Sequence, residues 1–297
     1  MGKLKKLLTS YSGKKVIYCP NPGNGGDALI AEATFRLFDR YGIKYSIYDW
    51  NTNNLKKSDH FFFGGGGNLV TRYPEASTIP AAVHDRVEKF IILPHTIEGH
   101  DDLFSNLKDN SIVFAREKKS FEYLKNFQNI GSIELDHDLA FSLLEDKKFI
   151  KKCKVYSIIC IPFYVNILRR KRKAFSLNQR SSIGHLFSFR EDREKTHGFV
   201  PWDNFDISKY TNFDSSMRVK SAVTKTATRI PAMINLFSII ETNRIHIAIS
   251  GLLMGKSVKL HPNNYWKNNA IYEFSIKNRF NNIRFIHCEN NNLSPML

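Results

Sequence analysis

The sequence predicts an α/β protein with two domains, each built on a parallel β-sheet. Three observations lead to this prediction. Short apolar runs alternate with helical patterns in the first half, a second such alternation begins near residue 186, and glycine-rich segments directly follow predicted strands. Strands that alternate with helices are typical of βαβ units, in which the strands are parallel. The length of 297 residues is sufficient for two cores.

The first domain is predicted from six segments, of which one reads as an amphipathic helix and five as buried strands. The helix is Ala28–Tyr41, and the strands are Lys15–Cys19, Tyr45–Asp49, Phe61–Phe63, Phe90–Pro94 and Ser111–Ala115. The apolar runs are short enough for buried strands, and the longer periodic segment is typical of a helix.

The second domain is predicted from a similar alternation in the second half. Its segments are a strand at Leu186–Arg190, a helical region at Ser216–Leu236 broken near Pro231, a strand at Ser238–Ile240, a helix at Ile245–Gly255, a strand at Val258–Leu260, and a loop followed by a helix at Asn263–Phe280. We therefore expect a first domain over residues 1–145, a basic and apolar linker over 146–182, and a second domain over 183–297. Ligands of open parallel sheets bind at the carboxyl ends of the strands, so a cleft between the domains is the expected site.

The charge of the chain predicts an anionic partner. The formal net charge is +16 at pH 7, which suits nucleic acid, anionic lipid or a phosphorylated substrate. The four cysteines, Cys19, Cys153, Cys160 and Cys288, form no CxxC pair, so neither a zinc site nor a disulfide framework is expected. The basic amino terminus lacks an apolar run long enough for a secretory signal, and we expect the protein to stay in the cytoplasm.

Two glycine-rich segments follow predicted strands. Asn21–Asp27 reads NPGNGGD and opens the first helix, where backbone amides can bind an anion. The segment is neither GxGxxG nor a P-loop, so a structural turn is an equally good interpretation. Gly64–Asn68 reads GGGGN, and four consecutive glycines indicate either tight packing or the close approach of a ligand.

Polar residues also follow the next two predicted strands. His95 and Thr96 come after Phe90–Pro94, and Arg116 comes after Ser111–Ala115. A guanidinium at this edge can hold a carboxylate or a phosphate through two parallel hydrogen bonds. The structural alternative is a salt bridge from Arg116 to Glu117 or another acid, with His95 satisfied in a turn.

The segment Glu241–Gly255 places Arg244 and His246 between a strand and an apolar helix. This arrangement offers an anion-binding group beside a proton carrier. Lys267 lies in the loop after the next strand and can add a further positive charge, although a loop lysine is usually solvated.

Together these segments resemble the polysaccharide pyruvyl transferase family. The resemblance rests on the order of GNGGD, GGGGN, AREKKS, DHDLAF, TNRIHIAISGLLMGKSV and NNYWKNNAIYEF. It implies two Rossmann-like domains in a glycosyltransferase-B-like arrangement. It also implies that phosphoenolpyruvate donates a pyruvyl group to a sugar diol of a bacterial surface polysaccharide or its lipid-linked precursor. The products are a cyclic pyruvate ketal and phosphate, and neither a metal nor a further cofactor is implied.

The resemblance also implies roles for individual residues. Arg116 matches the arginine of the family's AR motif, Arg244, Ile245 and His246 match its RLH motif, and Lys267 matches a lysine after its NxY segment. We expect the three cations to hold phosphoenolpyruvate and His246 to act as the general acid or base. We also expect polar residues of the first domain to bind the sugar: Asn24, Asp27, Asn68, His95, Asp138 and, as an alternative to the last, Asp136.

The segment from residue 147 to 180 is more basic and more apolar than a simple linker. Its apolar part, Val155–Leu168, is shorter than the roughly 20 residues that span a bilayer, and lysines and arginines flank it. We expect peripheral contact with the inner face of the plasma membrane. A buried strand or helix with a solvated basic flank is an equally good interpretation.

Two other functions are compatible with the sequence. A glycosyltransferase that uses a nucleotide sugar would share the two domains, the glycines and a basic anion site. A nucleic-acid-binding protein would explain the basic runs Lys3–Lys6 and Arg169–Lys173, but no nucleic-acid-binding module is recognisable, so no nucleic-acid partner is expected.

Overall fold

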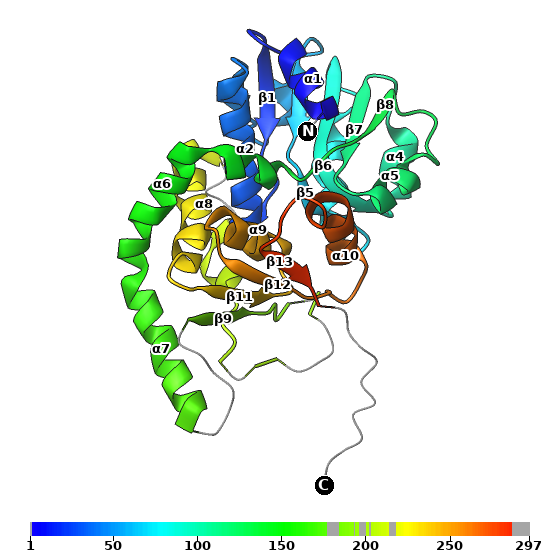
Figure 1. Cartoon of the computed structure of the whole chain (residues 1–297). Helices are drawn as coiled ribbons and strands as arrows, with labels where there is room; N and C mark the ends of the chain where they lie inside the picture. The colour runs from blue at the N-terminus through cyan, green and yellow to red at the C-terminus, as the bar shows by residue number, and fades with distance from the viewer. Residues whose placement is uncertain are drawn as a thin grey trace, which may run out of the picture. The chain divides into compact units, whose positions relative to one another are not determined.

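The computed structural model (Figure 1) describes residues 2–176, 184–192, 194–195, 200–201, 203–213 and 218–286. The chain divides into two compact units. The first unit comprises Met1–Lys152 and Thr211–Ile230, and the second comprises Cys153–Tyr210 and Pro231–Leu297. This division differs from the expected boundaries 1–145, 146–182 and 183–297, because residues 211–230 lie with the first unit.

The first unit contains the larger sheet, and all seven of its strands pair in parallel. The strands are β1 (Lys15–Cys19), β3 (Lys44–Ile47), β4 (His60–Phe63), β5 (Gly66–Val70), β6 (Lys89–Glu98), β7 (Ser111–Ala115) and β8 (Ser132–Leu135). Their order is β3-β1-β4-β6-β7-β8, with β5 paired to β6. The expected mixed α/β class with parallel sheets is confirmed; the sequence analysis had no strand at β5 or β8.

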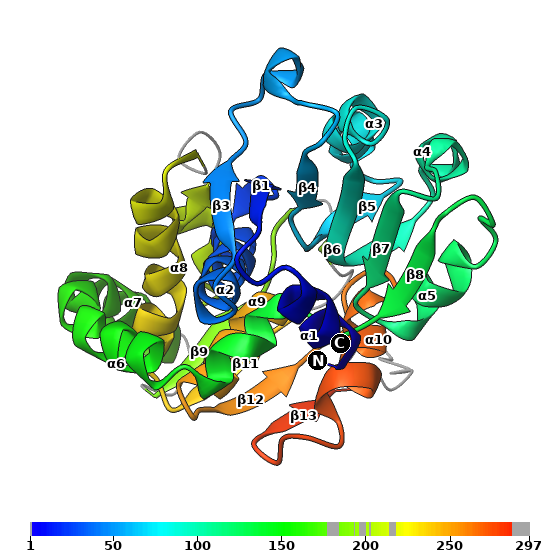
Figure 2. The ribbon, with the colours of Figure 1, turned by 90° about the horizontal axis from the view of Figure 1, so that it is seen from above.

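Helices cover both faces of this sheet because alternate side chains of its strands point to opposite sides. Phe62 packs edge to face against Tyr11 and Phe38 on one side. Phe61 and Phe63 lie in a buried apolar cluster on the other side. The helices are α1 (Gly2–Ser10), α2 (Gly25–Arg40), α3 (Thr78–Val83), α4 (Asp101–Asn106) and α5 (Lys118–Leu124). Figure 2 shows α1 and α2 on one side of the strands and α3–α5 on the other.

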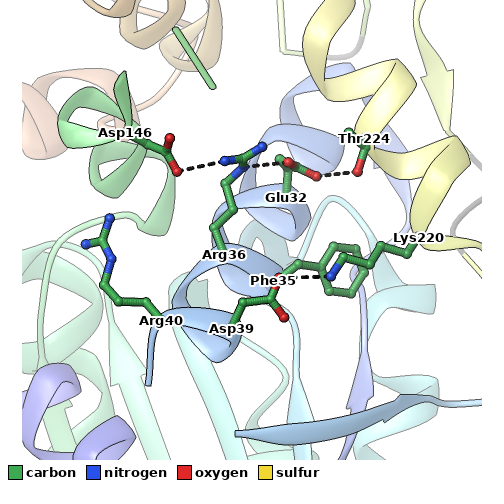
Figure 3. A pocket seen from close by; sticks show the side chains of 8 residues that line it. All are labelled: Glu32, Phe35, Arg36, Asp39, Arg40, Asp146, Lys220 and Thr224. Atoms are coloured by element: carbon green, nitrogen blue, oxygen red, sulfur yellow. Dashed lines mark hydrogen bonds and ion pairs between the residues drawn. The ribbon is translucent and has the colours of Figure 1, made fainter. Parts of the chain in front are cut away.

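Residues 220–230 of α8 (Lys220–Ile234) belong to the first unit, and polar contacts tie them to α2. Thr224 Oγ1 donates to Glu32 Oε2 at 2.6 Å, and Lys220 Nζ lies 3.0 Å from Asp39 Oδ2. These side chains line a pocket of about 370 Å³, in which Arg36 joins Glu32 to Asp146 (Figure 3).

A short antiparallel pair, β2 (Gly23–Asn24) with β10 (Asn212–Phe213), joins the same chain segments. The expected break of α8 near Pro231 is wrong, because the helix continues through that proline to Ile234.

The second unit contains a four-stranded parallel sheet in the order β13-β12-β11-β9. Its strands are β9 (His185–Ser188), β11 (Ile239–Thr242), β12 (Ser257–Leu260) and β13 (Ile283–Phe285). Helix α9 (Ile245–Leu253) packs on one face, and a Cβ at Gly251 would lie 2.6 Å from Val258 Cγ2. Helix α10 (Lys267–Ile271) continues into a π-helical turn, Tyr272–Ile276.

Residues 147–176 are helical throughout. They form α6 (Lys147–Tyr156), a 3-10 turn (Ser157–Cys160) and α7 (Ile161–Ser176). Neither these nor the other helices in the described part of the chain have the length and apolarity needed to cross a membrane.

Candidate active site

A network of polar side chains lies where β1 and β4 of the first unit end. The side chains of Asn21 and Asn68 bond to each other at 2.8 and 3.2 Å, and Asn68 Oδ1 lies 2.9 Å from His95 Nε2. Strand order reverses between β1 and β4, since the chain passes from β1 to β3 and returns to β4 on the other side. Such a switch point is where ligands of doubly wound sheets bind.

His95 is buried and bonded within this network. Its Nδ1 lies 3.2 Å from the carbonyl oxygen of Gly64, and the backbone N–H of Leu69 donates to its Nε2 at 3.3 Å. Burial, together with the positive charge of Arg116, holds the pKa of His95 well below its usual value. The imidazole is therefore neutral at pH 7.

Close packing against neighbouring backbone explains the glycines of the GGGGN segment. A Cβ on Gly64 would lie 2.5 Å from the backbone nitrogen of Asn21, and one on Gly65 would lie 2.7 Å from the carbonyl oxygen of Pro94. Real Cβ atoms do not approach backbone this closely, so these glycines let neighbouring strand ends converge.

Arg116 occupies a buried ion pair. Its Nη1 donates to Asp138 Oδ2 at 2.6 Å and its Nε donates to Thr96 Oγ1 at 2.8 Å. Arg116 is 1% exposed and Asp138 is 0% exposed. The structure therefore shows the salt-bridge alternative, with Asp138 as the acid; Glu117 caps α5 instead by accepting from the backbone N–H of Ser120. The other Oδ of Asp138 accepts from the backbone N–H of Ala140.

Asn24 and Asp27 close the amino end of α2. Asn24 Oδ1 accepts from the backbone N–H of Gly26 at 2.8 Å, and Asp27 Oδ2 accepts from the backbone N–H of Asn24 at 2.9 Å. This is a capping box, which satisfies amides that the first turn of a helix leaves without partners. Both side chains expected to bind sugar thus have a structural role.

A second cluster lies in the second unit, after the carboxyl ends of its strands. Arg244 directly precedes α9, and its Nε and Nη2 donate to the two oxygens of Asp206 at 2.7 and 2.6 Å. Its Nη2 also donates to Asp192 Oδ2 at 2.8 Å. Arg244 and Asp206 are both buried.

The cluster continues through Arg190 to Lys267. Arg190 donates to both oxygens of Asp192, at 2.8 and 3.0 Å, and to Glu194. Lys267 Nζ donates to Glu194 Oε2 at 2.5 Å, and Asn263 Nδ2 donates to the same atom at 3.2 Å. Two of the expected cations, Arg244 and Lys267, therefore belong to one network.

The sequence analysis missed Arg190 and the three carboxylates. Arg190 carries the signal that singled out Arg116, a position just after a buried strand. The acids have no such signal, because Asp192, Glu194 and Asp206 lie in irregular segments.

Asp192 is the most exposed carboxylate of this cluster, with 39% of its side chain accessible. Burial alone would raise its pKa, but the hydrogen bonds and charge of Arg190 and the charge of Arg244 hold the pKa far below its usual value. The carboxylate is therefore ionised, and three cations face three anions in this cluster.

His246 and Ile245 form the first turn of α9, directly after Arg244. Ile245 is 5% exposed and packs in the core, whereas His246 is half-buried. A partly accessible imidazole two residues after Arg244 is a candidate proton carrier for this cluster. Among the described residues, no group of acidic, histidine and cysteine side chains is arranged to hold a metal ion.

Comparison with known proteins identifies the family. A crystal structure of a functionally uncharacterised protein from Klebsiella pneumoniae subsp. pneumoniae NTUH-K2044 is similar to this chain, with a TM-score of 0.72 and 30% sequence identity. The match covers 96% of this chain and 97% of that one. No curated protein matches. The profile of the polysaccharide pyruvyl transferase family matches residues 24–258, and this chain therefore belongs to that family.

Proposed function

We propose that this protein transfers a pyruvyl group from phosphoenolpyruvate to a sugar of a bacterial surface polysaccharide or of its lipid-linked precursor, forming a cyclic ketal. Family membership supports pyruvyl transfer onto polysaccharide. The assignment of phosphoenolpyruvate as the donor is based on the convergence of Arg190, Arg244 and Lys267 after neighbouring strands. Phosphoenolpyruvate carries a phosphate and a carboxylate, which such cations bind through charge-assisted hydrogen bonds.

The anion would enter by exchange with a carboxylate of the cluster. Asp192 is the best candidate for displacement, because it is shared between Arg190 and Arg244 and is the most exposed of the three acids. Asp206 is buried and holds Arg244 through two hydrogen bonds, so it would remain and orient the guanidinium.

His246 is the proposed proton carrier. A proton adds to the methylene carbon of phosphoenolpyruvate, one sugar hydroxyl adds to the neighbouring carbon and loses its proton, and a second hydroxyl then displaces phosphate and loses its proton. The sugar loses two protons in total. One is balanced by the proton that the new methyl group gains, and the other leaves with phosphate. A half-buried imidazole in the first turn of α9 is suited to moving these protons.

The proposal also covers the residues that bind the acceptor and the location of the protein in the cell. Five polar side chains near the carboxyl edge of the first unit's sheet remain candidates for binding the acceptor, although each has the structural contacts described above: Asn24, Asp27, Asn68, His95 and Asp138. A glycosyltransferase-B-like arrangement would bring this edge to the phosphoenolpyruvate cluster. We also propose a cytoplasmic location.

The test is phosphate release from phosphoenolpyruvate by the purified protein, with a panel of free and lipid-linked sugars. In D2O, the expected ketal carries one deuterium in its methyl group. Arg244→Gln should raise the KM for phosphoenolpyruvate, and His246→Gln should lower kcat about 10²- to 10⁴-fold, which is the usual contribution of a general acid or base. His261→Gln is the matched control, since His261 Nε2 lies 2.8 Å from Glu241 Oε1 in a separate ion-pair group.

Acceptor-dependent phosphate release that both site variants impair would support the proposal. No release with any acceptor, combined with thermal stabilisation by a nucleotide sugar, would favour the glycosyltransferase alternative. Retention of full turnover by His246→Gln would refute the role of that histidine alone.

A further inference from the structure

One face of the helical segment 147–169 is both apolar and exposed. The exposed fractions are 61% for Val155, 68% for Ile158, 68% for Ile159, 47% for Ile161 and 39% for Val165. Only two other large apolar side chains are similarly exposed in the described part of the chain. Five neighbouring exposed apolar residues form the kind of patch that marks an interaction surface.

The opposite face of residues 157–167 is anchored within the second unit. Ile167 is fully buried, and Asn235 Nδ2 donates to Ser157 Oγ at 3.0 Å. The ring of Phe163 packs edge to face on that of Phe205, with centroids 4.9 Å apart. This part of the segment is therefore packed on the second unit, and its other face is the exposed one.

Basic residues precede and follow the apolar patch in the sequence. Five exposed lysines precede it on α6: Lys147, Lys148, Lys151, Lys152 and Lys154. The sequence RRKRK follows it from residue 169 to 173, and no Asp or Glu occurs between residues 147 and 173. An apolar strip between basic ends suits a surface that is apolar inside and negatively charged at its boundary.

We propose that the outward face of α6 and α7 lies on a bilayer that contains anionic lipid. The valines and isoleucines of the patch would enter the boundary between headgroups and acyl chains, while the lysines contact the headgroups. A second copy of this chain fits less well, because a symmetric contact through this face would oppose two like-charged basic surfaces. This proposal does not depend on pyruvyl transfer.

Vesicle flotation tests the proposal with the full chain. Binding is expected with phosphatidylcholine vesicles that contain phosphatidylglycerol and not with phosphatidylcholine alone. Lys151→Gln/Lys152→Gln should lower the partition coefficient about fivefold per lysine, which is the usual attraction of one basic residue to an anionic surface. Ile158→Ser/Ile159→Ser should lower it at least about tenfold, through loss of apolar burial.

The matched control is Lys118→Gln/Lys119→Gln, which removes two exposed lysines from α5 and should leave binding unchanged. Far-ultraviolet circular dichroism checks that each variant is folded. An equal loss of vesicle binding in this control variant would overturn the proposal, since general charge attraction would then be sufficient to explain the binding. Retention of binding by the isoleucine variant, binding to neutral vesicles, no binding at all, or a dimer that the isoleucine variant dissociates would each overturn it as well. Because flotation needs neither phosphoenolpyruvate nor a sugar, failure of the proposed activity leaves this test interpretable.

Discussion

Arg116 Nη1 lies 2.6 Å from Asp138 Oδ2, and both side chains are buried in the first unit. The pair connects the end of β7 to the 3-10 helix Leu139–Glu145, because the second oxygen of Asp138 accepts from the backbone N–H of Ala140. A charge in this position is stable only while its partner is present, since transferring an unpaired ion from water to a protein interior is strongly unfavourable.

We expect Asp138→Ala to lower the free energy of unfolding by about 3–5 kcal/mol, because it leaves the Arg116 guanidinium buried without its carboxylate. The double variant Arg116→Met/Asp138→Leu should lose much less, since it removes both charges. Urea unfolding followed by fluorescence measures the free energy of unfolding of the single and the double variant. Glu122→Ala is the control. It breaks an exposed ion pair with Lys125, which contributes little to the free energy of unfolding. Equal losses in the single and double variants would show that the charge pair itself does not determine stability here.

Asn24→Ala should lower the free energy of unfolding by about 1 kcal/mol, because it removes the cap of α2. Asn24→Ser keeps a capping oxygen and should be close to wild type in stability. The same two variants separate structure from sugar binding. If Asn24 also contacts the acceptor, the serine variant will have a higher KM for the sugar despite normal stability, whereas a purely structural Asn24 predicts unchanged kinetics.

Two strands of the first unit, β4 and β7, could be predicted well because their apolar runs are largely buried. Phe61–Phe63 and Ser111–Ala115 are continuous apolar or small segments, and both lie in the sheet at or within one residue of the predicted bounds. Strand β5 was missed because it begins with glycines that have low strand propensity and fit there through close packing. The place of residues 211–230 was also unpredictable, since it depends on contacts such as that of Thr224 with Glu32, far apart in the sequence.

The residues of the candidate site could be predicted only in part, again because their partners lie far away in the sequence. A position just after a strand identified Arg116 and Arg244, but position does not reveal the partner of an arginine. Arg116 has a buried aspartate 22 residues away, and Arg244 has one 38 residues away. Tertiary contacts that bring such acids to a cation leave no periodic pattern, so the ion-pair cluster of the second unit emerges only from the structure.

The two aspartates around Arg244 should respond in opposite ways to neutralisation. Asp192→Asn should lower the KM for phosphoenolpyruvate several-fold, since it removes a competing anion that is partly solvated and worth about 1 kcal/mol. Asp206→Asn should raise this KM, because Asp206 holds the guanidinium of Arg244 through two hydrogen bonds. Initial rates at varied phosphoenolpyruvate concentrations distinguish the two. A parallel increase in KM for both variants would contradict exchange at Asp192 and assign both acids to positioning.

His95 should make the protein less stable in mild acid. Its pKa in the folded state lies well below that of an ordinary histidine, mainly because of burial. The unfolded chain therefore takes up a proton at this position near pH 6.5, while the folded chain does not. The stability associated with neutral His95 is complete above that pH and declines as the pH falls from about 6.5 toward the folded pKa, by at most about 1.4 kcal/mol per pH unit.

The measurement is the free energy of unfolding between pH 5 and 8 for the wild type and His95→Gln. The glutamine variant can keep a hydrogen bond to the carbonyl oxygen of Gly64 but does not titrate, so its stability should decline less steeply below pH 6.5. Above pH 7 the difference between the two proteins should be constant, which provides the internal control for any packing loss caused by the substitution. Parallel curves over the whole range would mean that the folded protein protonates His95 as readily as the unfolded chain, and the bonded network of Asn21, Asn68 and His95 would then have to accommodate an imidazolium.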